Sequence, residues 1–150
     1  MIRVILEWKE AMTNEKLYDA LDAGASIELN LAGVTFPCIR GGQRQDKIAS
    51  LVKYVGMTLT LVPEPDNQYD ACAIRVDADG VDIGYIPKKG TVWVDLAEPN
   101  VFTRPMRVDR DNLNEVLGAY LGPLSAKLGA IYGGYNGKNF GVSIKLFKEE

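Results

Sequence analysis

Residues 57–88 read MTLTLVPEPDNQYDACAIRVDADGVDIGYIPK, and this stretch decides the fold class. Apolar residues alternate with polar or small ones in three segments, at 57–61, 72–76 and 81–86. Such alternation is typical of short, half-buried strands. The pair Asp79-Gly80 separates the last two segments and favours a tight hairpin. Pro63 begins the loop between the first two, where a full ladder of backbone hydrogen bonds is not expected. The stretch therefore predicts three short strands.

Working outward from this stretch, the periodicity changes twice. Helical spacing at residues 14–23 and 111–121 predicts two helices. Alternation from Ser26 predicts a strand that runs on to Phe36. The remaining segments are a loop at 41–43, a region without a clear pattern at 88–110, and a final hairpin at 124–132 and 140–147. The expected fold is mostly β with flanking helices, a small, partly open OB- or SH3-like β-barrel of five to six strands.

The chain of 150 residues fits one domain with a decorated terminus. We expect residues 1–25 to form an N-terminal helical extension and residues 26–150 to form the barrel. Within the barrel, residues at about 90–122 are expected to be a helical insertion.

Composition excludes several kinds of chemistry. Histidine is absent, so Ser-His and Cys-His nucleophile pairs and histidine-based zinc sites are excluded. Cys38 and Cys72 are too few for a four-ligand zinc site, and we expect two reduced thiols in a cytoplasmic protein. No apolar run approaches the roughly 20 residues that span a bilayer, so no membrane partner is expected. The net charge of −3 argues against coating nucleic acid by bulk electrostatics, yet it leaves a local groove open. We expect no cofactor and no enzymatic activity.

Four motifs follow one another in the middle of the chain. They are Gly33-Val-Thr-Phe36, Glu64-Pro-x-Asn-x-Tyr-Asp70, Ala73-Ile-x-Val76 and Gly84-Tyr-Ile-Pro-Lys88. In this order they resemble the HIRAN domain family over about residues 29–89, and the final hairpin does so more weakly. The resemblance implies a barrel with a groove for nucleic acid, in a stand-alone bacterial or phage-type member. Family members fused to fork-remodelling helicases, which act in DNA repair, grip the free 3′ end of single-stranded DNA.

The resemblance also implies roles for individual residues. Phe36 and Tyr69 match the aromatic positions that contact the terminal bases, and Asp70 matches the carboxylate that accepts a hydrogen bond from the terminal hydroxyl. Tyr85 and Lys88 match positions on the strand that flanks the groove, with Lys88 available to a phosphate. Residue chemistry agrees with these roles. Aromatic rings stack on any base, at roughly 1–3 kcal/mol per base. A carboxylate accepts a hydrogen bond from a hydroxyl but repels a phosphate.

Two positions depart from the family pattern. Thr35 stands where helicase-fused members carry a basic residue, and Pro37 stands where a second aromatic often follows. Arg40 or Arg44 in the next loop is a candidate replacement for the missing charge. The expected nucleic-acid-binding site therefore comprises Thr35, Phe36, Arg40, Tyr69, Asp70, Tyr85 and Lys88.

Three alternatives stay open at this point. Tyr69 and Asp70 could serve the fold alone, with aspartate accepting backbone N–H groups in a turn and tyrosine packing over the barrel end. The groove could take a peptide or a partner protein such as a helicase or nuclease, which the mild acidity and Thr35 favour. Glu64, Asp66 and Asp70 could hold a divalent metal in a carboxylate-dependent enzyme, although carboxylates in such a loop are more often solvated.

Overall fold

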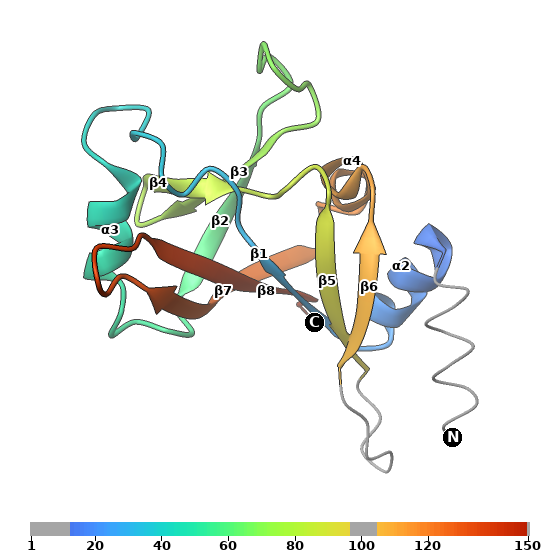
Figure 1. The fold of residues 1–150 in the computed structure, drawn as a ribbon. Coiled ribbons are helices and arrows are strands. Elements are labelled where there is room, and N and C mark those ends of the chain that lie inside the picture. Colours follow the sequence, from blue (N-terminus) through green and yellow to red (C-terminus); the bar gives the residue numbers. More distant parts are fainter. Residues whose placement is uncertain (1–12, 97–104, 150) are drawn as a thin grey trace.

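The computed structural model describes residues 13–96 and 105–149, which contain eight strands and three helices (Figure 1). In chain order they are α2 (Asn14–Asp22), β1 (Ser26–Asn30), α3 (Arg44–Ser50), β2 (Thr58–Pro63), β3 (Ile74–Ala78), β4 (Val81–Tyr85), β5 (Gly90–Asp95), β6 (Met106–Arg110), α4 (Leu113–Gly118), β7 (Leu124–Gly133) and β8 (Phe140–Lys148). Parts of the expected N-terminal extension (1–12) and of the expected insertion (97–104) lie outside the described residues.

The eight strands form one antiparallel sheet in the order β4-β3-β2-β7-β8-β1-β5-β6. The sheet curls into a partly open barrel. Just after β1 the chain stops pairing with β8 and pairs with β4, the strand at the edge of the sheet. There Ala32 and Tyr85 exchange two backbone hydrogen bonds, each 2.9 Å long. Gly84 permits this approach, since a Cβ at that position would lie 2.8 Å from the Ala32 carbonyl oxygen. The glycine of the Gly-Tyr-Ile-Pro-Lys motif therefore serves barrel closure.

One apolar core fills the barrel and extends under the helices. Ile27 of β1 and Ile144 and Leu146 of β8 are completely buried, as the alternation of strand residues predicts. Leu17 of α2 and Ile48 of α3 are equally buried and belong to the same core. Both helices therefore pack onto the barrel through apolar side chains.

Helices α2 and α4 lie beside the β5–β6 pair, which extends the sheet outward from β1 (Figure 1). Thr13 caps the start of helix α2, and its hydroxyl accepts a hydrogen bond from the Lys16 N–H at 3.2 Å. The Tyr18 hydroxyl of α2 donates to the Val116 carbonyl of α4 at 2.6 Å. Its ring also stacks on Tyr120, with ring centroids 4.9 Å apart. These contacts fix the position of α4 relative to the barrel.

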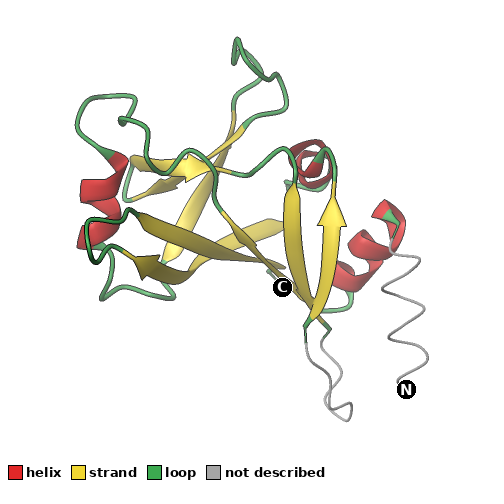
Figure 2. Cartoon of the chain, viewed as in Figure 1, coloured by secondary structure: helices red, strands yellow, loops and turns green. Residues whose placement is uncertain are grey.

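Two long loops lie on the same side of the barrel and are drawn in green in Figure 2. The first spans residues 31–43, between β1 and α3, and the second spans residues 64–73, between β2 and β3. Both loops carry motif residues identified above. Among the described helices, none has the length and hydropathy that a membrane crossing needs.

The structure confirms a mostly β, partly open barrel with helices on its outside. The number of strands is larger than the expected five to six, because residues 90–95 and 106–110 form β5 and β6. Each of these two strands has only two inward-facing apolar residues, which is too short a pattern to identify from sequence. The part of 90–122 that the structure describes thus contains two strands and the short helix α4.

The strand expected to reach Phe36 ends at Asn30. The chain instead turns at Gly33, which has a φ of 70°, and the Phe36 N–H donates to the Gly33 carbonyl at 3.1 Å. Helix α3 was not expected, because its seven residues contribute only Ile48 as a buried apolar side chain. The turn matters for the site, because it releases Phe36 from the sheet.

Candidate nucleic-acid interface

A groove opens between the two long loops, next to the end of β4 and the start of α4. Its volume is about 460 Å³. The residues that line it are Ala32, Gly33, Phe36, Pro37, Arg44, Asn67, Tyr69, Asp70, Ala73, Tyr85, Ile86, Pro87, Lys88 and Asn114. Five of the seven expected site residues therefore meet in one groove. The other two, Thr35 and Arg40, are exposed in the first loop and are not among the lining residues.

Two polar residues at its start give the second loop its shape. The Asn67 side-chain oxygen accepts hydrogen bonds from the backbone N–H groups of Tyr69 at 2.9 Å and Asp70 at 3.1 Å. Asn67 is itself held by Glu64, whose Oε1 accepts from the Asn67 amide at 3.0 Å. Asparagine commonly caps its own following backbone in this way. Glu64 and Asn67 of the motif therefore build the loop that presents Tyr69 and Asp70.

Glu64 is the hub that joins this loop to the sheet. Its Oε2 receives Arg75 Nη1 at 2.9 Å, and its Oε1 receives the Tyr85 hydroxyl at 2.8 Å. Burial raises the pKa of the Glu64 carboxyl, but the hydrogen bonds from Asn67, Tyr85 and Arg75 outweigh burial and leave the pKa below its usual value. Glu64 is therefore an ionised, structurally engaged carboxylate.

Asp70 is held on both carboxylate oxygens. Its Oδ1 accepts from the Cys72 backbone N–H at 2.9 Å, and its Oδ2 accepts from the Asn114 side-chain amide at 2.6 Å. These two hydrogen bonds, with a smaller contribution from the charge of Lys88, hold the pKa of Asp70 below its usual value despite partial burial. A carboxylate offers about four lone pairs, so these two hydrogen bonds leave acceptor capacity toward the groove.

The aromatic residues of the groove differ sharply in exposure. Tyr69 is 89% exposed and Phe36 is 62% exposed, whereas Tyr85 is half-buried. The Tyr85 hydroxyl is occupied by Glu64, and its ring lies 5.2 Å from the Arg44 guanidinium carbon. Tyr69 does not pack over the barrel end as the purely structural interpretation requires. Tyr69 and Phe36 therefore present free aromatic faces at the groove.

Arg44 carries the second positive charge among the lining residues, and it is buried. Its Nε lies 2.7 Å from Asp82 Oδ2, and its Nη1 donates to the Gly33 carbonyl at 2.8 Å. Arg44 therefore anchors the first loop to β4 and does not replace a missing surface charge. Lys88, in contrast, is exposed at the groove.

Sequence reasoning missed one lining residue entirely and misjudged another. Asn114 is 3% exposed and comes from α4, which matches no motif; no local pattern points to it, because its partner Asp70 lies 44 residues away in the chain. Asn67 was part of the quoted motif but was not assigned to the site. Its spacing of two and three residues from the N–H groups it accepts is a recognisable turn signal.

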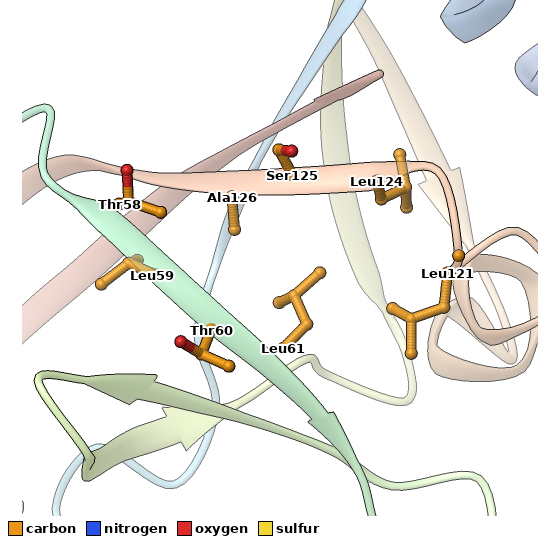
Figure 3. A pocket seen from close by; sticks show the side chains of 9 residues that line it. Thr58, Leu59, Thr60, Leu61, Leu121, Leu124, Ser125 and Ala126 are labelled. Carbon is orange, nitrogen blue, oxygen red and sulfur yellow. The ribbon is translucent and has the colours of Figure 1, made fainter. Parts of the chain in front are cut away.

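The described residues contain no group of three or more acidic, cysteine or histidine side chains arranged to hold a metal ion. Glu64 uses its oxygens on Arg75, Tyr85 and Asn67, as described above. A second hollow, of about 410 Å³, lies where β2 and β7 separate (Figure 3). Its lining residues are Thr58, Leu59, Thr60, Leu61, Leu121, Gly122, Leu124, Ser125 and Ala126. All are uncharged and none is aromatic, so this hollow offers no positive charge for a phosphate and no stacking surface.

Comparison with known proteins agrees with the motifs in the groove. The model of the HIRAN domain family matches residues 26–102, which is just over half of the 150 residues. The matched segment contains the two loops and β1 to β5, but not α4, β7 or β8. No curated protein and no solved structure gives a significant match to the chain. On the family match, this chain belongs to the HIRAN domain family.

Proposed function

We propose that this protein binds single-stranded DNA at a free 3′ end through the groove formed by Phe36, Tyr69, Asp70, Tyr85 and Lys88. HIRAN domains are generally DNA-binding modules and are generally not catalytic on their own. The proposal adds the form of DNA, the strand end and the residues that contact it. Thr35 and Arg40 are proposed as outer contacts, reached by nucleotides beyond the groove.

One observation carries the proposal: two exposed aromatic side chains stand beside an ionised carboxylate in the same groove. An 89% exposed tyrosine contributes little to the core, so packing does not explain Tyr69. Stacking on bases explains both Tyr69 and Phe36. Asp70 has a structural partner on each oxygen, Cys72 and Asn114, and its remaining lone pairs are the acceptors proposed for the strand end.

The charge of Asp70 determines which strand end fits. A 3′ hydroxyl donates a hydrogen bond to a carboxylate, whereas a 3′ phosphate brings like charges together. An internal nucleotide has no free 3′ hydroxyl to donate. The groove is therefore expected to prefer a free 3′ end over a phosphorylated end and over a strand without ends, with Lys88 on a backbone phosphate.

Fluorescence anisotropy with a 5′-labelled oligo(dT) tests this at two salt concentrations. The hydroxyl-ended strand should bind about tenfold or more tighter than the 3′-phosphorylated strand, because a hydrogen bond to a charged group contributes about 1.5–3 kcal/mol. An unlabelled circular oligo(dT) should compete poorly. Equal binding of both ends, or no binding by a protein that unfolds cooperatively, would contradict the proposal.

Matched variants assign the effect to the groove. Tyr69→Ala should weaken binding by about 5- to 150-fold, the loss expected when a stacked base loses its aromatic platform. Tyr135→Ala, 67% exposed in the loop between β7 and β8, should have no effect. Asp70→Asn should reduce the preference for the hydroxyl end, whereas Asp66→Asn, exposed on the same loop and absent from the groove lining, should not.

A second candidate function is a protein-interaction module in which the groove binds a peptide segment of a helicase or nuclease. The observation that favours it is the weak positive charge of the groove. Its lining residues include two cations, and Arg44 is already paired with Asp82. Binding that persists at high salt and after nuclease treatment would favour this candidate, since phosphate contacts weaken steeply with salt.

We also propose a cytoplasmic location, which the free thiols of Cys38 and Cys72 support.

A further inference from the structure

We propose that Asn114 of α4 is a positioning residue that holds the Asp70 carboxylate in the orientation needed to receive the strand end. This inference rests on the proposed function of the groove. It gives α4 a role in the interface, although α4 lies outside the segment that matches the family.

The hydrogen bonds of Asn114 define the orientation of its amide. Its Nδ2 donates to Asp70 Oδ2 at 2.6 Å, and its Oδ1 accepts from the Glu115 backbone N–H at 2.9 Å. A flipped amide would place oxygen against the carboxylate and nitrogen against an N–H donor, losing both bonds. Because Asn114 is 3% exposed and also lines the groove, its amide is presented to Asp70 from a buried position.

Helix α4 is itself firmly anchored next to the groove. Leu113 is completely buried, and Leu117, one turn further on, is 1% exposed. The Leu113 N–H donates to the Lys88 carbonyl at 2.7 Å. Two consecutive residues of α4 therefore contact two proposed DNA-binding residues, Lys88 through the backbone and Asp70 through a side chain.

The hydrogen bond from Asn114 restrains a carboxylate on a loop that has little packing of its own. Asp70 sits on a loop whose neighbouring residue, Tyr69, is almost fully exposed, so little packing restrains the loop on that side. The bond from Cys72 holds one carboxylate oxygen, and the bond from Asn114 holds the other. With both oxygens held, the remaining lone pairs keep a fixed direction and the carboxyl stays ionised. Fixed acceptor geometry favours a hydroxyl end because the ligand does not have to order the side chain on binding.

The test compares Asn114→Leu with Glu115→Gln. Leucine has the same branched arrangement of four side-chain heavy atoms as asparagine, with bulkier methyl ends, and removes the donor. Glu115 is an exposed neighbour on the same helix that does not line the groove. The first measurement uses no DNA: a carbon-13 NMR titration of the Asp70 side-chain carboxyl. We expect the pKa of Asp70 to rise in Asn114→Leu and to stay unchanged in Glu115→Gln. An unchanged titration in Asn114→Leu overturns the inference, whatever DNA does.

The second measurement is the ratio of affinities for hydroxyl-ended and phosphate-ended oligo(dT). This ratio should fall by about tenfold in Asn114→Leu, because the acceptor is no longer held. A general loss of fold would lower both affinities together and leave the ratio unchanged, so the ratio is compared in a variant that unfolds cooperatively. In such a variant an unchanged ratio also overturns the inference. If the wild type binds neither strand, the proposed function fails, and the NMR titration alone decides whether Asn114 positions Asp70.

A double-mutant cycle keeps the test valid if Asn114→Leu is unstable. Asn114→Asp keeps the shape and removes the donor, and it places a second carboxyl against Asp70. In an Asp70→Asn background, either change at position 114 should have no further effect on the affinity ratio, since the positioned carboxylate is gone. A further drop of the same size in that background would show that Asn114 acts independently of Asp70 and would overturn the inference.

Discussion

Removing Arg44 should destabilise the protein strongly, because Arg44 is one half of a buried ion pair. The side chains of Arg44 and Asp82 are only 4% and 7% exposed, and Arg44 Nε lies 2.7 Å from Asp82 Oδ2. Arg44→Met keeps most of the side-chain length and leaves the Asp82 carboxylate buried without its counter-charge. Loss of one partner of a buried pair typically costs about 3–5 kcal/mol. That is a large part of the roughly 5–15 kcal/mol that stabilises a typical domain.

The pH dependence of this loss follows from the pKa of Asp82. Burial raises that pKa, but the hydrogen bonds from Arg44 and from the Ile39 N–H, with the charge of Arg44, bring it below the usual value. A depressed folded-state pKa stabilises the protein above the unfolded-state pKa, and this stabilisation is lost as pH falls through the folded value. In Arg44→Met the lowering contributions of Arg44 disappear, and burial acts against only the backbone hydrogen bonds from Ile39 and from Asp82 itself. The free energy of unfolding of the variant should therefore fall furthest below that of the wild type at neutral pH, and this difference should become smaller in acid.

Urea unfolding, monitored by circular dichroism at neutral and at mildly acidic pH, measures both quantities. Lys89→Met is the control, because Lys89 and its partner Asp111 form an ion pair that is more than three-quarters exposed; it should leave stability within experimental error. Replacing both partners, with Asp82→Leu added to Arg44→Met, should recover part of the loss. A neutral-pH loss below about 1 kcal/mol, or a gap that does not narrow in acid, would refute the reasoning.

Two further predictions concern barrel closure and phosphate binding. Gly84→Ala should destabilise the barrel by about 1–3 kcal/mol or more in urea unfolding, because its Cβ would lie 2.8 Å from the Ala32 carbonyl oxygen; Gly122→Ala, where a Cβ has no neighbour within 4 Å, should not. Lys88→Gln should reduce the slope of log affinity against log salt by about 1 for oligo(dT) and leave the preference for the hydroxyl end intact. Lys89→Gln should leave that slope unchanged, since Lys89 is not among the groove-lining residues, and a slope that Lys88→Gln does not alter would remove Lys88 from the phosphate contacts.

Local patterns allowed much of the barrel to be predicted. Strands β2, β3 and β4 were readable because apolar residues alternate with polar or small ones along their sequences. Strands β5 and β6 could not be predicted, because each has only two buried apolar residues. Their positions depend on pairing with distant segments: β5 pairs with β1 and with β6. The course of the first loop was also misjudged. Alternation continues past Asn30 in the sequence, but the left-handed backbone at Gly33 turns the chain out of the sheet.

The candidate site was likewise predictable only in part. Motif order predicted that Phe36, Tyr69 and Asp70 would be brought together, and they line one groove. No feature of the sequence placed Asn114 beside Asp70. That contact depends on the packing of α4 against α2 through Tyr18, in a part of the chain with no motif. The charge of the groove was also predicted only in part: Arg40 or Arg44 was a candidate replacement for the missing charge, and Arg44 is instead bound by a buried aspartate on β4.

The motif residues separate into two groups with different physical roles. Glu64, Asn67 and Arg75 are linked by hydrogen bonds to one another and give the second loop its shape, while Gly84 closes the barrel. These residues explain why a motif of this kind accompanies the fold. Tyr69 is different: nine-tenths of its side chain faces solvent, and its backbone, not its ring, is what Asn67 holds. A scaffold of partly buried, hydrogen-bonded polar groups around one exposed aromatic is the arrangement of a preorganised binding surface, because the ordering takes place in folding and not in ligand binding. The fold therefore accounts for most of the motif, and the exposed ring of Tyr69 is accounted for by the proposed binding site.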